Sequence, residues 1–536
     1  MSILLHLLVA STALCFLVPI VFPGGDQAVY YFERIICGAF FLTGLLFIWR
    51  RERTRDILPR FRLVIWIVFA GSVAHLGVFT WSARTSLFLA DQDITNISSA
   101  IANTANGFGI LPTAYVHTGE SGSYLGHHFA PALLFLLPAY LGGNILGLDH
   151  FVYPASLFFV SALGLLVWIR LIGIKFSDDA LSSVLAACML LNAFPLLRLS
   201  QSFHNEMFVI LFSGLFFLAL ELEKTWLIYS AALLWMMVKE DTSVYVALIG
   251  VFLAIDQQTR HNKSGGRVAL AFRSQGFRLA LFALSYFATG HLLQAWFGGK
   301  TGPDWSIFFH GEWPQVTTLS IAVARPIALV GIVGAFAFLP LTRPLFSLVA
   351  ILPIAVLHLL SNHPWHSTYY GHYAYAILPF LMYGSLLGIH RVSRLREEAP
   401  AGIGRFFASQ SFRTGLLCFC LGISFYFNSG DRQTPGKLFK TDPEYGSAWS
   451  LAREIPKDYC VFAERNLSPL VPVDRLVLPL APVEGNPNFI EGSHGLTSHC
   501  KKRLEFIGFE KPSSSATHPA RTVLKQAGRF SLREVN

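Results

Sequence analysis

Ionisable residues able to bind or transform a substrate lie in five short clusters between apolar runs of the sequence. A charged side chain inside a membrane segment costs about 2.5–3.5 kcal/mol on insertion scales, so charges in such places indicate a functional site. If the clusters meet at one membrane surface, an enzyme or a carrier acting there is favoured. The clusters are Asp91-Gln92-Asp93, His127-His128, His204-Asn205-Glu206, Lys239-Glu240-Asp241 and the stretch from His363 to His372.

The two clusters richest in acids suggest different chemistry. A carboxylate at Asp91 or Asp93 could act as a general base on a hydroxyl or hold a metal, whereas a solvated acidic loop is the alternative. The three charges of Lys239-Glu240-Asp241 have almost no loop around them, so burying them is costly unless they pair or meet a ligand. Lysine is a common partner of phosphate, and a self-paired structural turn is the alternative.

The histidines suggest an anionic or sugar ligand. His204 and Glu206 lie in a short turn between two helix-length runs, where such a pair can bind metal, phosphate or sugar, or simply form a polar turn. The stretch from His363 to His372 combines aromatics with imidazoles, which favours a wet pocket or an interfacial loop equally. His127-His128 could join that pocket, but the spacing of these histidines is too loose to indicate zinc.

The elements that position these clusters are membrane helices. Of the 536 residues, 53% are hydrophobic and 14% are charged, and the mean hydropathy is +0.50. Runs of about 18 apolar residues or more can cross a bilayer, and Leu63–Trp81 and Phe151–Ile169 are of this kind. The net charge of +9 comes from short basic loops, so it indicates membrane topology and not nucleic acid binding.

Three arginine-rich loops determine the expected topology. They run from Arg50 to Arg62, from Arg260 to Arg278 and from Arg391 to Arg413, and we place all three in the cytoplasm. With the N-terminus inside, roughly 13 spans satisfy every basic loop and bring all five polar clusters to the outer face. The run Phe129–Leu146 is broken by prolines, so we expect it to stay outside as a juxtamembrane or re-entrant hairpin.

We expect three parts in the chain. Residues 1–62 would form an N-terminal helix pair and a basic cytoplasmic loop. Residues 63–428 would form an all-α transmembrane core with a large first outer loop at 82–150. Residues 429–536 would form an outer tail, which is polar and rich in proline and glycine.

The tail itself could be a small α/β domain or an irregular extension. Tyr459–Ala463 and Arg475–Leu480 are typical of strands, whereas the composition from near Ser513 indicates disorder. If the tail lies outside the cell, Cys460 and Cys500 would form a disulfide, because oxidising compartments permit one. Two unpaired thiols are the alternative.

The order of the motifs resembles a family of bacterial multi-spanning membrane proteins that is similar to the GT-C class of glycosyltransferases. That class includes the polyprenyl-phosphate-mannose and aminoarabinose transferases. The chain departs from the family pattern at Ser99 and Ala102, where Gln and Trp are usual, and at Asn205, where Pro is usual. The matching positions are Asp93 with Asn103 and Gly107, His128-Phe129-Ala130-Pro131, Phe203-His204-Asn205-Glu206, and Lys239-Glu240-Asp241.

The resemblance implies a polytopic GT-C-like fold and a glycosyltransferase in the bacterial inner membrane, with the active site and the tail on the periplasmic or extracellular side. It implies that Asp93, or Asp91, deprotonates an acceptor hydroxyl, which attacks a polyprenyl-phosphate sugar with inversion. Lys239 would stabilise the leaving phosphate, assisted by His204 or His372. The acceptor would be a glycan, a lipid or a protein, and membrane lipid would surround the donor's tail.

The other acidic residues would complete the donor site. Glu206, Glu240 and Asp241 would orient the lysine or bind sugar hydroxyls, with His128 beside them. GT-C enzymes differ in their need for a divalent metal, so a metal-free site and one with Mg²⁺ or Mn²⁺ both agree with the sequence. The alternative function is a transporter or flippase of lipid-linked sugars, which needs polar residues along a complete path. The inner halves of the spans are nearly all apolar, which disfavours that alternative.

Overall fold

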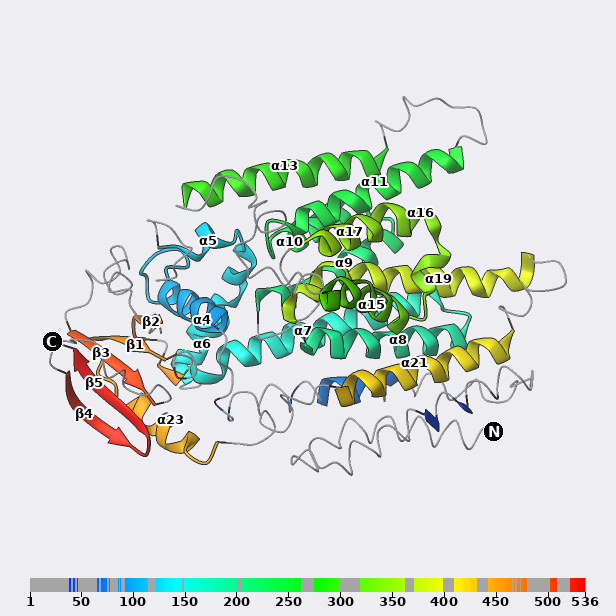
Figure 1. Cartoon of the computed structure of the whole chain (residues 1–536). Helices are drawn as coiled ribbons and strands as arrows, with labels where there is room; N and C mark the ends of the chain where they lie inside the picture. Colours follow the sequence, from blue (N-terminus) through cyan, green and yellow to red (C-terminus); the bar gives the residue numbers. More distant parts are fainter. Residues whose placement is uncertain are drawn as a thin grey trace.

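The protein consists of a helical bundle with a small β-sheet at one end, as its computed structural model shows (Figure 1). The structure describes residues 38–39, 42–43, 46, 65–66, 69–74, 77, 85, 87, 92–113, 122–146, 149–199, 204–261, 274–297, 319–361, 371–398, 409–430, 442–464, 467, 470–472, 474–479, 502–508 and 521–535.

Eight helices form the main bundle, and the longer ones among them lie along roughly the same axis in Figure 1. Helix α9 is apolar on every side, as expected of a helix that is buried in a core or a membrane. The eight are α7 (Asp149–Lys175), α8 (Ala180–Leu199), α9 (Phe208–Glu221), α10 (Thr225–Met236), α11 (Thr242–His261), α13 (Gln275–Trp296), α19 (Leu378–Glu398) and α21 (Gln410–Gly430).

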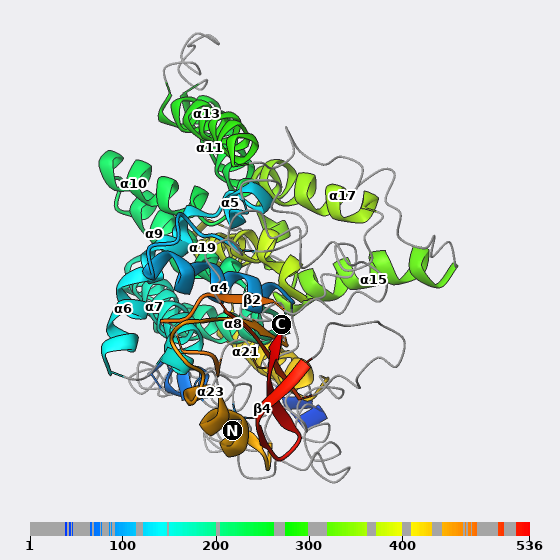
Figure 2. The same cartoon turned by 90° about the vertical axis from the view of Figure 1, so that its left-hand side faces the viewer.

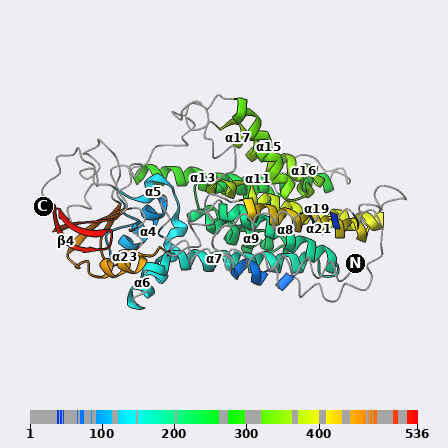
Figure 3. The same ribbon diagram turned by 60° about the horizontal axis from the view of Figure 1, so that its bottom comes forward.

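A second group of helices stands to the side of this bundle, as Figures 2 and 3 show. Among the described helices, two segments are both long and apolar enough to cross a membrane, Phe158–Lys175 and Ala374–Arg394. The larger number of spans expected from hydropathy therefore stays a prediction. The lateral group comprises α15 (Leu319–Ala335), η5 (Leu339–Thr342), α16 (Pro344–Phe346), the π-helical turn η6 (Ser347–Ile351) and α17 (Leu352–Leu360).

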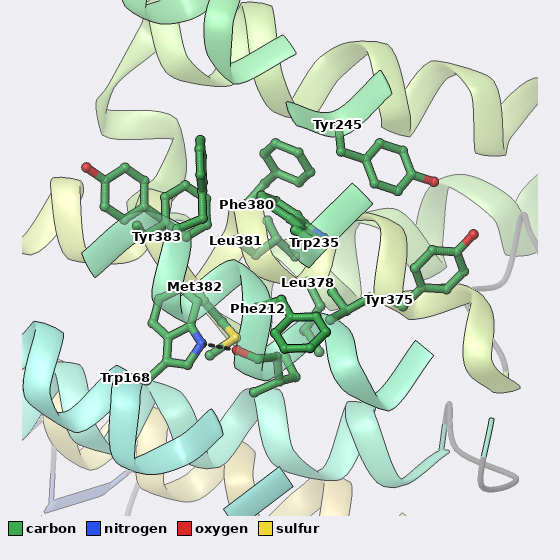
Figure 4. Packing of buried hydrophobic residues seen from close by; sticks show 14 of the residues in the cluster. Trp168, Phe212, Trp235, Tyr245, Tyr375, Leu378, Phe380, Leu381, Met382 and Tyr383 are labelled. Carbon is green, nitrogen blue, oxygen red and sulfur yellow. Dashed lines mark hydrogen bonds between the residues drawn. The ribbon is translucent and has the colours of Figure 1, made fainter. Parts of the chain in front are cut away.

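Aromatic side chains fill the centre of the bundle (Figure 4). The buried Trp168 donates a hydrogen bond from its Nε1 to the carbonyl of Ile210 at 3.0 Å, which ties α7 to α9. A Cβ at Gly214 would lie 2.8 Å from Nε1 of that indole, so the close approach of the two helices requires glycine there. Phe217 and Tyr383 stack with ring centroids 4.1 Å apart and join α9 to α19.

Short helices occupy the end of the bundle that faces the sheet (Figure 1). The run Phe129–Leu146 forms no long helix there: it consists largely of a 3₁₀ turn, η2, and the ten-residue helix α6. The expectation that the run does not span the membrane stays a prediction. The short elements are α4 (Gln92–Ala105), α5 (Tyr124–His127), η2 (Pro131–Leu136), α6 (Leu137–Leu146), η3 (Asn205–Met207) and η7 (Gly371–Ala376).

The tail forms a five-stranded sheet in the order β2-β1-β3-β5-β4, with helix α23 (Tyr445–Arg453) in contact with β4 and β5. Strand β1 is parallel to β2 and β3, whereas β5 is antiparallel to β3 and β4. The α/β expectation is therefore correct. The strands are β1 (Tyr459–Ala463), β2 (Val477–Pro479), β3 (Lys502–Ile507), β4 (Arg521–Ala527) and β5 (Phe530–Val535).

The disorder expected after Ser513 is wrong for residues 521–535. These residues form the β4–β5 hairpin, in which Phe530 and Leu532 are buried in the core of the sheet. The polar composition of the segment hid this short alternation of apolar side chains. Cys460 on β1 is disulfide-bonded, as an outer location would permit. Its expected partner, Cys500, lies outside the described residues.

Candidate functional site

Six ionisable side chains gather where the turns before α9 and between α10 and α11 meet the loop after α5. Together they form the sheet-end cluster, at the end of the bundle that faces the sheet. Figure 1 shows α4 and α5 between this end and the strands. The cluster consists of His128, His204, Glu206, Lys239, Glu240 and Asp241.

Glu206 forms the centre of the cluster. Its Oε1 accepts a hydrogen bond from Nζ of Lys239 at 3.1 Å, and its Oε2 lies 3.0 Å from Nδ1 of His204. Lys239 and Glu206 side chains are only 9% and 4% exposed. Asn205 donates from Nδ2 to the carbonyl of Val238 at 2.8 Å, which fixes one turn against the other. Removing one partner of such a buried pair would leave an uncompensated charge, so Lys239 and Glu206 depend on each other in the folded chain.

Glu240 has both carboxylate oxygens occupied. Oε1 lies 3.0 Å from Nδ1 of His128, and Oε2 accepts from the backbone N–H of Phe129 at 3.0 Å. Burial opposes ionisation of Glu240, but the interactions with His128 and the nearby ammonium of Lys239 outweigh it and lower its pKa to about 2. Glu240 is thus an ionised anchor for the loop between α5 and η2.

Asp241 retains unused binding capacity. Its Oδ2 accepts hydrogen bonds from the hydroxyls of Tyr245, at 3.1 Å, and of Tyr375. Its Oδ1 is buried and has no hydrogen-bond partner in the part of the chain that the structure describes. Burial raises the pKa of Asp241 even though Lys239 is close. The carboxyl group can therefore hold a proton or receive one more hydrogen bond from a ligand.

The three consecutive charges reach three different partners because the α10–α11 turn is tight. The hydroxyl of Thr242 donates to the carbonyls of Trp235 at 2.8 Å and Lys239 at 2.7 Å, which closes the turn. The turn is therefore not paired with itself alone, because all three charged side chains have partners outside it. Of the expected partners of Lys239, Glu206 does contact it, whereas Glu240 and Asp241 bind elsewhere.

Some expected site residues are only partly described. Asp93 is the second residue of α4, and His372 lies in η7, but their side chains are outside the described part, as is the whole of Asp91. Among the described residues, no group of three or more His, Cys, Asp and Glu side chains could hold a metal ion.

Two tyrosines that the sequence did not indicate belong to the site. Tyr245 follows Asp241 by four residues at the start of α11, a helical spacing that brings side chains together. Tyr375 is 134 residues away from Asp241 in the chain, so no local pattern could have indicated the contact. Figure 4 shows both tyrosines on one side of the aromatic core and Tyr383 on the other.

A second set of charges lies at the opposite end of the bundle; we call it the far-end cluster. Lys175 forms an ion pair with Glu221, which also accepts from the hydroxyl of Tyr383 at 2.8 Å. Arg413 forms an ion pair with Asp179. Burial opposes ionisation of Asp179, but Arg413 keeps its pKa below the ordinary value. The far-end cluster comprises Lys175, Asp179, Glu221, Tyr383 and Arg413.

The family model for a predicted membrane protein, DUF2079, matches residues 83–486, which is most of the chain. The chain belongs to the DUF2079 family. The match begins just before α4 and ends after β2, so it includes every residue of the sheet-end cluster. No curated protein is significantly similar in sequence to this DUF2079 chain.

The fold of the DUF2079 chain is similar to that of ArnT, a GT-C glycosyltransferase. ArnT from Cupriavidus metallidurans bound to undecaprenyl phosphate is 13% identical, with a TM-score of 0.52 over 88% of this chain and 98% of ArnT. The apo state of the same enzyme gives a TM-score of 0.50, with the same identity and coverage. The expected GT-C-like membrane fold is therefore confirmed.

Proposed function

We propose that the protein is an inverting membrane glycosyltransferase. It moves a sugar from a polyprenyl-phosphate donor to an acceptor hydroxyl at the outer face of the bacterial inner membrane. The observation that carries the proposal is the buried Lys239–Glu206–His204 set in an ArnT-like fold. The solved ArnT structure contains undecaprenyl phosphate, which supports a lipid phosphate as the ligand class.

In the proposed reaction, Asp93 or Asp91 takes the proton of the acceptor hydroxyl. The freed oxygen attacks the anomeric carbon, and the bond from that carbon to the phosphate oxygen breaks on the opposite face. Polyprenyl phosphate leaves with the electron pair as an anion, so the protein mainly has to position and stabilise it. Lys239 supplies positive charge for this anion, while Glu206 holds the ammonium in place.

The remaining cluster residues hold the sugar and the loops. Asp241, with an unpartnered carboxyl oxygen among the described residues, accepts a hydrogen bond from a sugar hydroxyl. Glu240 and His128 keep the loop after α5 against the donor site. His204 orients Glu206, and His372 in η7 assists at the phosphate.

The outer orientation of the site has two supports. Cys460 is disulfide-bonded, as is usual in oxidising compartments. The arginine-rich stretches border the far ends of α11, α19 and α21, opposite the sheet (Figure 1), as the positive-inside rule requires of a cytoplasmic side. We infer the same three parts as from sequence, 1–62, 63–428 and 429–536, with the N-terminus inside and roughly 13 spans.

A flippase would need polar groups between the two clusters. Helix α9 runs from one cluster to the other, and its residues from Phe208 to Leu220 include a single polar side chain, that of Ser213. This apolar stretch disfavours a polar path along α9 and favours the transferase.

The proposal is tested with the purified protein in lipid, offered a panel of polyprenyl-phosphate sugars with and without divalent metal. Release of free polyprenyl phosphate is expected, and it should disappear when Asp91 and Asp93 are both changed to Asn. The matched control is Asp178→Asn, an exposed acid outside the cluster. No release, but sugar-lipid crossing a liposome wall, would support the flippase instead.

A further inference from the structure

The segment that carries the proposed base contacts the C-terminal sheet domain on both sides of α4. Before the helix, the carbonyl of Thr85 accepts a hydrogen bond from the backbone N–H of Asp442 at 2.9 Å. Leu87 is 2% exposed and belongs to the hydrophobic core between α23 and the sheet. A residue of the first outer loop is therefore part of the core of the tail.

At the other end of α4, Asn103 pairs with strand β2. Its Oδ1 accepts from the N–H of Val477 and its Nδ2 donates to the carbonyl of Val477, both at 3.2 Å. Nδ2 also donates to the carbonyl of Pro112 at 3.1 Å. Since β2 is an edge strand, the fully buried amide of Asn103 satisfies backbone groups that another strand would otherwise satisfy.

Helix α4 also connects the sheet to the sheet-end cluster. Its buried side chains Ile97 and Ile101 belong to the same hydrophobic core as Phe129 of the loop after α5. The backbone N–H of Phe129 donates to Glu240, which follows Lys239 in the chain. A continuous series of packed and hydrogen-bonded groups thus joins β2 to the candidate site.

Local features indicate that α4 needs outside support. The amide of Asn96 on α4 is buried without a hydrogen-bond partner among the described residues, at a cost of about 1–3 kcal/mol. Leu87 and Leu111, on either side of the helix, have positive φ of 54° and 47°. Such leucine conformations persist only where the surroundings hold them.

We propose that the C-terminal sheet domain anchors α4 and that Asn103 is a positioning residue for the active site. The functional part of this inference rests on the proposed glycosyltransferase activity. Asp93 and Asn103 are ten residues apart on one helix, so about 15 Å of rigid helix transmits a displacement from β2 to the proposed base. Small displacements of catalytic groups of about 1 Å can slow a reaction a hundredfold.

Amide hydrogen exchange of the full chain in lipid discs tests the anchoring directly. Asn103→Asp keeps the acceptor for Val477 N–H and removes both donated bonds. We expect exchange in residues 92–105 to become at least about tenfold faster in this variant, while α9 keeps its protection. The control is Thr522→Ala, an exposed change on the distant edge strand β4. Unchanged exchange in Asn103→Asp and in Leu87→Ala would overturn the anchoring.

Kinetics test the positioning role separately. We expect Asn103→Asp to lower the kcat for polyprenyl phosphate release about tenfold and to leave the KM for the donor nearly unchanged. Faster exchange with unchanged kcat would overturn the positioning role. If the wild-type chain releases no polyprenyl phosphate from any sugar offered, the proposed function fails, whereas the exchange measurement still decides whether the sheet anchors α4.

Discussion

The two charge clusters lie at opposite ends of the same helices, and their charges are matched differently. At the far end, the two acids each pair with a cation, Glu221 with Lys175 and Asp179 with Arg413. The sheet end has three acids for one lysine and two histidines. One of these acids, Asp241, has a buried oxygen without a partner in the described structure.

This difference separates a structural arrangement from a binding site. At the far end, one ion pair joins α7 to α9 and the other joins the start of α21 to the α7–α8 turn. Each carboxyl group of the far-end cluster therefore has a cationic partner. Surplus carboxyl groups at the sheet end destabilise the folded chain unless a ligand or a proton joins them. Between the ends lies the aromatic core of Figure 4, which separates the two clusters.

The largest expected effect comes from removing the lysine at each end. Lys239→Met leaves Glu206 buried without its cation, which should cost about 3–5 kcal/mol of unfolding free energy and at least a hundredfold in activity. The double variant Lys239→Met with Glu206→Gln should regain stability, because no buried charge is left without a partner. It should not regain activity, because the positive charge for the leaving phosphate is still missing. Thermal unfolding and polyprenyl phosphate release in lipid measure the two effects.

The matched experiment at the far end uses Lys175→Met with Glu221→Gln. This double variant should recover both stability and activity, because the ion pair there contacts no substrate in the proposed reaction. Equal loss of activity in the two stabilised double variants would show that the clusters do not differ in role.

The contributions of the two ends to folding stability should change with pH in opposite directions. Burial raises the pKa of Asp241, so the folded state holds its proton longer and stability falls as pH rises from about 4. Asp241→Asn should flatten that fall and lower activity about tenfold. Arg413 lowers the pKa of Asp179 against the effect of burial, so its contribution is present above pH 4 and is lost as pH falls below it.

Melting temperatures of wild type, Asp241→Asn and Asp179→Asn between about pH 2 and pH 8 measure these signs. The stability advantage of wild type over Asp179→Asn should shrink toward acid, and its disadvantage against Asp241→Asn should grow toward base. Parallel curves for all three proteins would contradict the assignment of unlike ionisation to the two ends.

The smallest expected effect is the difference in activity between two tyrosine variants, one at each end of the bundle. Tyr375→Phe removes a hydroxyl that donates to Asp241, and Tyr383→Phe removes one that donates to Glu221. Each change should cost about 1 kcal/mol in stability. Only Tyr375→Phe should lower kcat, by several-fold, in the polyprenyl phosphate assay; a similar fall in Tyr383→Phe would place the far end in the reaction.

The sequence predicted elements better than contacts. Hydropathy located the start of α7 to within two residues and its end to within six, and the pattern of Tyr459–Ala463 predicted β1 correctly. The β4–β5 hairpin escaped because its apolar side chains are few and widely spaced within a polar segment. The cost of charges beside apolar runs indicated Lys239 and Glu206 as candidate site residues, and the resemblance to the GT-C class implied that Glu206 orients Lys239.

The contacts of Asp241 and of Asn103 could not be predicted in the same way. Tyr375 reaches the carboxyl from another helix, and Val477 reaches the amide across 374 residues of sequence. Such pairs depend on how the bundle and the sheet pack, and a single sequence carries no periodic signal of that packing.

The lateral helices α15 and α17 have a practical consequence for purification. Ile327, Val330, Leu352 and Leu360 are exposed on helices that stand away from the bundle (Figure 2). An apolar surface of this kind must be covered by lipid or detergent to remain soluble. Short-chain detergents should therefore loosen these helices first, and an extract that keeps its native lipid should retain the active conformation longest.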